Sequence, residues 1–177
     1  MKLIQRTTLL FALFATCSLS IALFAQEPPV NIAPARHPAL ATAQEQIRIA
    51  WLKVDAAQHA NDWDLQGHGT HARQLLFDAG EQLRMAATAA NHNPGPKAPA
   101  RGDFGPEPEV NISRERHPAL AAAQIEIRGA WMKIVQAQKA NDWDMDGHAQ
   151  KAKELVFQAA EEIKAAAMAA NENGHRR

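Results

Sequence analysis

Residues 110–173 read VNISRERHPALAAAQIEIRGAWMKIVQAQKANDWDMDGHAQKAKELVFQAAEEIKAAAMAANEN, and residues 30–93 repeat this stretch 80 positions earlier in the chain. The two copies align without a gap, and 36 of the 64 aligned positions are identical. Self-similarity at a fixed offset marks a repeated supersecondary unit, which buries its hydrophobic face against a neighbouring unit. The chain therefore contains one structural unit twice.

Each copy contains two segments in which apolar residues recur every three or four positions, the spacing of one face of an α-helix. In the first segment these residues are Leu40, Ala43, Ile47, Ala50, Val54 and Ala57, matched by Leu120, Ala123, Ile127, Ala130, Ile134 and Ala137. In the second segment they are Ala72, Leu75, Leu76, Ala79, Leu83, Ala86 and Ala90, matched by Ala152, Leu155, Val156, Ala159, Ile163, Ala166 and Ala170. Because the polar connection between the segments is short, each copy is predicted to form an antiparallel helical hairpin.

A proline marks the beginning of the first helix in each copy. Pro38 and Pro118 suit the first helical position, where a backbone N–H would have no partner inside the helix. His37 and His117 are therefore predicted to lie at or next to the N-cap.

The alanine content determines how the hairpins must be covered. Alanine supplies 37 of the 177 residues, so one hairpin buries little area per residue and needs a partner. We predict an all-α fold in which the two hairpins pack as an antiparallel four-helix bundle, with Trp51 and Trp131 widening the buried face. The hairpins could point the same way or oppose each other. The alternative is two separate hairpins that each pair with another chain.

The sequence divides into four segments. Residues 26–93 and 110–177 carry the first and second hairpin repeats, and residues 94–109 form a linker rich in Pro and Gly, which cannot sustain a helix. Residues 1–25 precede the repeats and have the composition of a signal peptide.

The expected signal peptide implies export. Lys2 and Arg6 precede an uncharged apolar stretch, residues 7–25, in the layout of a secretory leader. Cleavage could follow Ala22 or Ala25, and the mature protein is expected in the periplasm or outside the cell. An uncleaved leader is the alternative, and it is the only membrane contact that the sequence predicts.

Charge and motif content exclude several classes of protein. The 19 basic and 19 acidic residues give a formal charge of zero, which argues against a nucleic-acid partner. The single cysteine, Cys17, lies in the leader, so the mature chain has neither a disulfide framework nor a cysteine zinc site. The chain also lacks a Cys-x-x-Cys-His motif, a Gly-rich phosphate loop and a repeated nucleophile beside a base, so we expect no enzymatic activity.

Aspartates near the tip of each hairpin suggest oxygen ligands. The segment DWDMDG at residues 142–147 has the alternate carboxylates and the glycine with which a calcium-binding loop opens. Position twelve of such a loop should be a bidentate Glu, but here it is Lys153. Capping of helix ends is therefore the simpler interpretation of these aspartates. The candidate metal-binding carboxylates are Asp64, Asp142, Asp144 and Asp146.

Histidines are the other candidate ligands. His68 and His71 are three positions apart on one helical face, a spacing that can share a metal ion, and Asp64 is close to them in sequence. The second copy has His148 but carries Lys151 in place of the second histidine. Capping or solvation of each imidazole is the alternative to metal binding.

Sharing of an ion between the two copies depends on how the hairpins are oriented. His68 would meet His148 if the hairpins pointed the same way. If they opposed each other, His37 would meet His148 and His68 would meet His117. Residues at opposite ends of one helix cannot share an ion, because a helix of about 22 residues is roughly 33 Å long.

The segment GHAQKA at residues 147–152, together with the alanine-rich helices and the leader, resembles the small periplasmic metal-binding proteins of bacteria. These proteins are helical bundles that hold copper, nickel or related divalent ions through histidines. The resemblance implies that His68 and His148 hold a metal ion, with His71 as an additional ligand.

Two functions follow as expectations. The first is a non-enzymatic bundle that binds a divalent ion such as copper, nickel or zinc weakly. The second is a structural or protein-interaction module that meets a protein partner or a second copy of itself through apolar helix faces. Its candidate contact residues are Trp63, Phe77, Trp143 and Phe157. The methionines expected to fill the core are Met85, Met132, Met145 and Met168.

Overall fold

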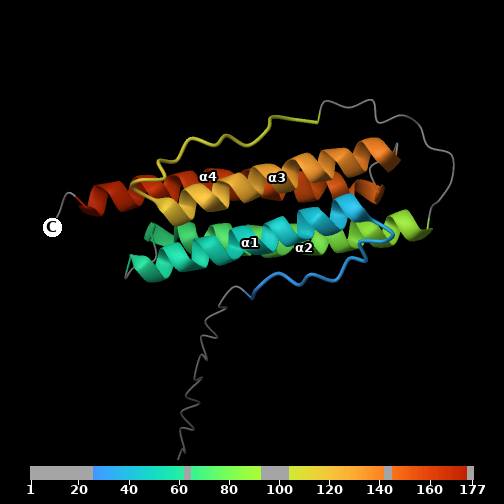
Figure 1. Ribbon diagram of the computed structural model, residues 1–177, viewed down its shortest axis with the longest axis horizontal. Coiled ribbons are helices and arrows are strands. Elements are labelled where there is room, and N and C mark those ends of the chain that lie inside the picture. The colour runs from blue at the N-terminus through green and yellow to red at the C-terminus, as the bar shows by residue number, and fades with distance from the viewer. Residues whose placement is uncertain (1–25, 62–64, 93–103, 142–144, 175–177) are drawn as a thin grey trace, which may run out of the picture.

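The computed structural model describes residues 26–61, 65–92, 104–141 and 145–174. In this part of the chain every regular element is helical, and no strand occurs. The elements are α1 (Pro38–Ala60), η1 (Leu65–Gly67), α2 (His68–His92), α3 (Pro118–Asn141), η2 (Met145–Gly147) and α4 (His148–Gly174). Figure 1 shows the four long helices side by side, so the predicted all-α bundle is confirmed.

The predicted apolar stripes form the core. Every stripe residue of α1 and α3 is at most 3% exposed. The α2 and α4 stripes are buried as well, except for Ala90 and Ala170 near the helix ends, which are partly buried. Trp51 and Trp131 extend this core at 8% and 9% exposure, as predicted. Alanine at about half of the stripe positions lets the helix backbones approach each other closely.

Proline begins α1 and α3 at the expected position. Pro38 and Pro118 are the first helical residues, and His37 is the N-cap of α1. The imidazole of His37 makes no capping hydrogen bond to the helix. It lies instead beside the end of α2, where its Nε2 is 3.1 Å from Oδ1 of Asn91.

The two hairpins oppose each other. The closest pairings in the bundle are those of α1 with α3 and of α2 with α4. Gln66, just before α2, donates to Glu172 near the end of α4, while His148 at the start of α4 meets Gln82 in α2. Figure 1 shows α3 and α4 stacked on α1 and α2. The start of each second helix therefore lies beside the later part of the other.

A left-handed turn precedes the second helix of each hairpin. Leu65 and Gln66 have φ of 52° and 57°, and Met145 and Asp146 have φ of 48° and 59°; a glycine with positive φ follows each pair. A left-handed conformation costs an L-residue roughly 1–2 kcal/mol. The side chains of Leu65 and Met145 are fully buried, which offsets much of this cost.

An extended segment runs along the outer side of each hairpin and leads into its first helix (Figure 1). We call residues 26–37 the first strap and residues 104–117 the second strap. Residues 104–109, which the sequence assigns to the linker, thus already lie on the second hairpin. Pro108 within this segment is buried.

A buried glutamine holds each strap. Oε1 of Gln124, a residue 1% exposed, accepts the backbone N–H of Asn111 at 2.8 Å and that of Ile112 at 3.0 Å. Its Nε2 donates to Oδ1 of Asn111 at 3.1 Å. Gln44 holds the first strap in the same way, through Asn31 and Ile32. The Val-Asn-Ile of each copy is therefore a structural motif.

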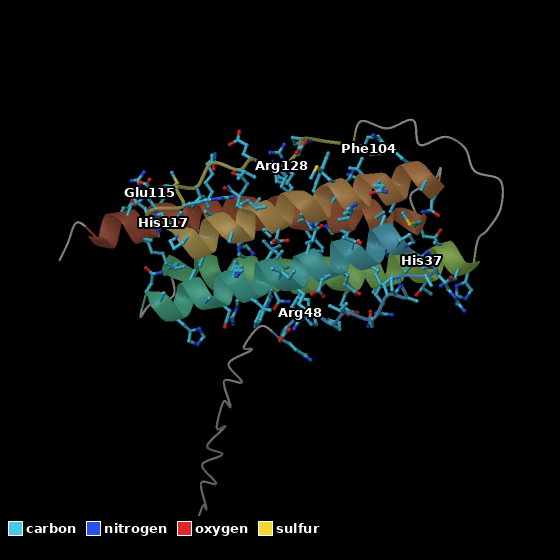
Figure 2. All side chains as sticks on the ribbon, viewed as in Figure 1. His37, Arg48, Phe104, Glu115, His117 and Arg128 are labelled. Atoms are coloured by element: carbon cyan, nitrogen blue, oxygen red, sulfur yellow. The ribbon has the colours of Figure 1, made fainter. Side chains whose placement is uncertain are left out.

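Ion pairs and the histidine before each Pro complete the strap contacts. Arg48 pairs with Glu27, and Arg128 pairs with Glu107, one pair for each strap. Figure 2 labels the two arginines, which lie on opposite sides of the bundle. Nε2 of His117 lies 3.0 Å from Oδ1 of Asn171, which matches the contact of His37 with Asn91 in the first hairpin. These polar residues recur in both copies because both straps need them.

The methionine prediction is wrong for two residues. Met145 is fully buried, but Met132 and Met168 are 48% and 59% exposed. Both lie outside the apolar stripes of their helices. Among the described helices, none combines the length and the apolar composition needed to cross a membrane.

Replacing Gln124 with Ala tests the role of the buried amide. The substitution leaves the N–H groups of Asn111 and Ile112 without their acceptor, so the free energy of unfolding should fall by about 1–3 kcal/mol. Urea unfolding measures this loss, and hydrogen exchange at the same two amides should accelerate. Gln136→Ala, at an exposed position of α3, is the control and should change stability by less than about 0.5 kcal/mol. Unchanged exchange in Gln124→Ala would contradict the role assigned to this side chain.

Candidate functional site

Four of the seven predicted metal-ligand residues lie in the described part of the chain. They are His68, His71, Asp146 and His148. The other three, Asp64, Asp142 and Asp144, lie outside the described residues, as do Trp63 and Trp143.

The structure brings His68 and His71 to one carboxylate. Nδ1 of His68 lies 2.7 Å from Oε2 of Glu162, and Nδ1 of His71 lies 3.0 Å from Oε1 of the same residue. The histidines occupy the first turn of α2, whereas Glu162 belongs to α4. This cluster therefore joins the two hairpins.

Sequence reasoning missed Glu162. It lies 94 residues after His68 and belongs to the other copy, so no local motif connects the two. Its one distinctive sequence feature is that the first copy has Gln82 at the corresponding position. The antiparallel packing of α2 on α4 is needed to place it beside the histidines.

The cluster is partly open to solvent. The side chains of His68, His71 and Glu162 are 35%, 61% and 24% exposed. Because Nδ1 of each ring faces Glu162, Nε2 is the remaining nitrogen, and neither Nε2 has a hydrogen-bond partner among the described residues. A carboxylate that holds one ring nitrogen of a histidine orients the other nitrogen and raises its basicity, as commonly happens around protein-bound metals.

The opposite end of the bundle carries the equivalent residues of the second copy. There Nδ1 of His148 lies 2.8 Å from Oε1 of Gln82, and Lys151 takes the place of His71. An amide and an ammonium thus replace the carboxylate and the second imidazole. The two ends have the same backbone arrangement but different chemistry.

Histidines from the two copies are not brought together. Fourteen residues of α4 separate Glu162, which contacts His68, from His148; this is about 21 Å along the helix. His117 contacts Asn171, nine residues beyond Glu162, or about 14 Å. His37 and His117 themselves lie at opposite ends of the bundle (Figure 2).

No complete protein-ligand shell is present in the described part of the chain. Among residues 26–61, 65–92, 104–141 and 145–174, no group of three or more His, Cys, Asp or Glu side chains is placed to hold a metal ion. Asp146 is exposed and belongs to the left-handed turn before α4. A metal ion at His68 and His71 would therefore depend on water for its other ligands.

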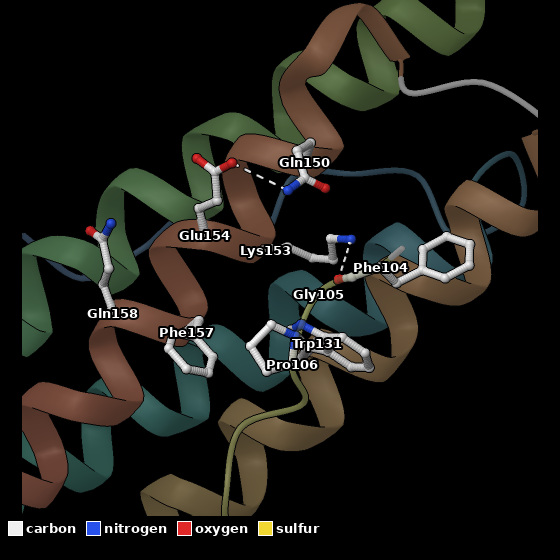
Figure 3. A pocket seen from close by; sticks show the side chains of 9 residues that line it. All are labelled: Phe104, Gly105, Pro106, Trp131, Gln150, Lys153, Glu154, Phe157 and Gln158. Carbon is white, nitrogen blue, oxygen red and sulfur yellow. Dashed lines mark hydrogen bonds between the residues drawn. The ribbon is translucent and has the colours of Figure 1, made fainter. Parts of the chain in front are cut away.

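Phe157, a predicted contact residue, lines a cavity of about 300 Å³ on the second hairpin (Figure 3). Phe104, Pro106 and Trp131 form apolar parts of its wall. Lys153 is 2% exposed, and its Nζ donates to the carbonyl oxygen of Phe104 at 2.7 Å. The same Nζ lies 5.0 Å from the centre of the Phe104 ring, within the range of a cation–π interaction.

The corresponding cation of the first hairpin is neutralised by a neighbouring carboxylate. Arg73 lies 4.7 Å over Trp51 and forms an ion pair with Asp55. In the second copy, Val135 stands at the position of Asp55, and Lys153 stands at that of Arg73. The two hairpins therefore differ on this side as well as at their ends.

Comparison with protein-family models, with curated proteins and with solved structures finds no match to this chain.

Proposed function

We propose that the protein is a non-enzymatic helical bundle that binds a divalent transition-metal ion weakly through His68 and His71. The observation that supports this proposal is the contact of both Nδ1 atoms with Glu162, at 2.7 and 3.0 Å. Glu162 would not bind the ion itself. It would orient the two histidines, and each histidine would bind the ion through Nε2.

The ligand type limits the choice of ion. Neutral imidazole suits copper, nickel and zinc, whereas calcium and magnesium prefer oxygen ligands. Two protein ligands leave several coordination positions to water, so the affinity should be modest. The exposure of His71 at 61% gives the ion a route from solvent.

Thermal unfolding in the presence of copper, nickel, zinc or calcium tests the proposal. At a free concentration one hundred times Kd, a bound transition metal should stabilise the protein by about 2.7 kcal/mol, and calcium should not. The double variant His68→Ala/His71→Ala should lose this stabilisation. Glu162→Gln should bind about 10- to 100-fold more weakly, because it removes the outer carboxylate.

The second copy supplies the matched control. His148→Ala/Lys151→Ala should keep the full effect of the metal, because these residues lie at the other end of the bundle. The reverse exchange, Gln82→Glu/Lys151→His, should create a second site and raise the metal stoichiometry from one to two ions per chain. Equal loss of stabilisation in both double-alanine variants would contradict the assignment to His68 and His71.

A second candidate is a protein-interaction module, which the cavity beside Phe157 supports. Sedimentation of the full chain at increasing concentration tests self-association through this face. Phe157→Ala should weaken association about tenfold or more, because an aromatic anchor in a pocket often dominates an interface. Phe77→Ala, at the equivalent position of the first hairpin, is the matched control and should have little effect. A protein that stays monomeric at every concentration would contradict self-association through this face.

We further propose that the leader directs export to the periplasm or the medium. Expression of the full chain in a Gram-negative bacterium, followed by mass measurement of the exported product, tests this. The expected mass corresponds to cleavage after Ala22 or Ala25. An uncleaved product in the membrane fraction would show that the leader is an anchor.

A further inference from the structure

A second cavity, of about 230 Å³, lies between the second strap and α4. The strap contributes Ser113 and Arg116, and α4 contributes Lys164. His117, at the junction of the strap with α3, completes the polar side of the cavity. The strap and α4 therefore converge on it, and neither candidate function uses it.

The charge of the lining is positive. Among the described residues that line the cavity, two are permanent cations and none is a carboxylate. The guanidinium of Arg116 has no ion-pair partner in the described part of the chain. Nζ of Lys164 lies 3.6 Å from Oε2 of Glu109, whose side chain is 68% exposed and which also accepts a hydrogen bond from Nδ2 of Asn111 at 2.7 Å. Such a long, exposed pair contributes little and can yield to a better anion.

The neutral polar groups also favour an anion. Ser113 Oγ accepts the backbone N–H of Arg116 at 3.4 Å, so its hydroxyl hydrogen remains able to donate. Asn171 holds Nε2 of His117 at 3.0 Å, which fixes the ring in the wall of the cavity. Met168 is 59% exposed at the rim and adds an apolar surface next to the charges.

The first repeat has a similar set of residues but a different charge balance. Arg36 and His37 correspond to Arg116 and His117, and Arg84 corresponds to Lys164. Nε of Arg84, however, lies 3.0 Å from Oε2 of Glu81 in its own helix. Arg84, one of the two permanent cations of the first repeat, is thus closely paired, which makes the second repeat the better anion site.

We propose that the cavity at Arg116, His117 and Lys164 binds a phosphate-type oxyanion. A guanidinium fits two oxygens of such a group at once, and an ammonium adds a point charge at close range. The exposed Met168 allows the phosphate to carry an organic group. A soluble phosphate ester and a lipid headgroup share this chemistry, so the experiment must distinguish the two sources.

Calorimetric titration of the full chain tests the proposal, with inorganic phosphate, phenyl phosphate and vesicles of phosphatidylcholine with or without phosphatidic acid as probes. The ionic strength must be held constant, because salt screens exposed charges. We expect one saturable phosphate site per chain. Binding of phenyl phosphate without binding to the phosphatidic acid vesicles indicates a soluble ester, and binding to those vesicles indicates a lipid headgroup.

The variant Arg116→Ser/Lys164→Ser should bind phosphate about 10- to 100-fold more weakly, because it removes both charged donors. The matched control Arg36→Ser/Arg84→Ser should bind as the unmodified protein does, and circular dichroism should show that both variants are folded. The absence of saturable binding by every probe would overturn the proposal, as would an equal loss in the two variants. Metal binding at His68 and His71 is measured separately and does not depend on this result.

Discussion

The opposed packing of α2 against α4 is the constraint on which the rest of the structure depends. The alanine-rich stripes are narrow, so a hairpin can exclude water from its apolar face only when a second hairpin covers it. Opposition of the hairpins places the start of each second helix beside the middle of the other. His68 therefore meets Glu162, and His148 meets Gln82. The same packing that closes the core determines which polar side chains become neighbours.

Residues that are identical in the two copies mainly maintain the fold. Gln44 and Gln124 satisfy the backbone N–H groups of the straps, as buried donors require. The histidine before each first helix meets an asparagine at the end of the second. Their recurrence is explained by a structural need that arises once in each hairpin. Identity between copies is therefore no guide to a ligand site in this protein.

Positions that differ between the copies carry the chemical differences. Glu162 and His71 correspond to Gln82 and Lys151 in the other copy, and Lys164 corresponds to Arg84, which is closely paired in the first copy. A duplicated fold needs each structural contact in both halves, whereas a binding site can form in one half alone. Each half thus provides the natural control for the other.

The spacing of apolar residues was sufficient to predict the helices and their buried faces, because helical periodicity is a local property. The prolines likewise placed the starts of α1 and α3. Met132 and Met168 show the limit of residue type as a guide, since both are apolar yet lie outside the stripes and are exposed. The straps are a further limit: their residues show neither a helical nor a strand period, and their positions depend on tertiary contacts such as those with Gln44 and Gln124.

The sequence by itself determined the duplication, the four helices, the stripes that they bury and the pair of histidines on one turn of α2, because each of these depends on residues close together in the chain. Tertiary structure alone decided that the hairpins oppose each other, that Glu162 joins those histidines and that Arg116 and Lys164 line one cavity. Both contacts join residues that are distant in the sequence. The contact of Glu162 with the histidines also depends on the orientation of the hairpins, and the local pattern allows two orientations equally. Packing of the whole bundle makes that choice.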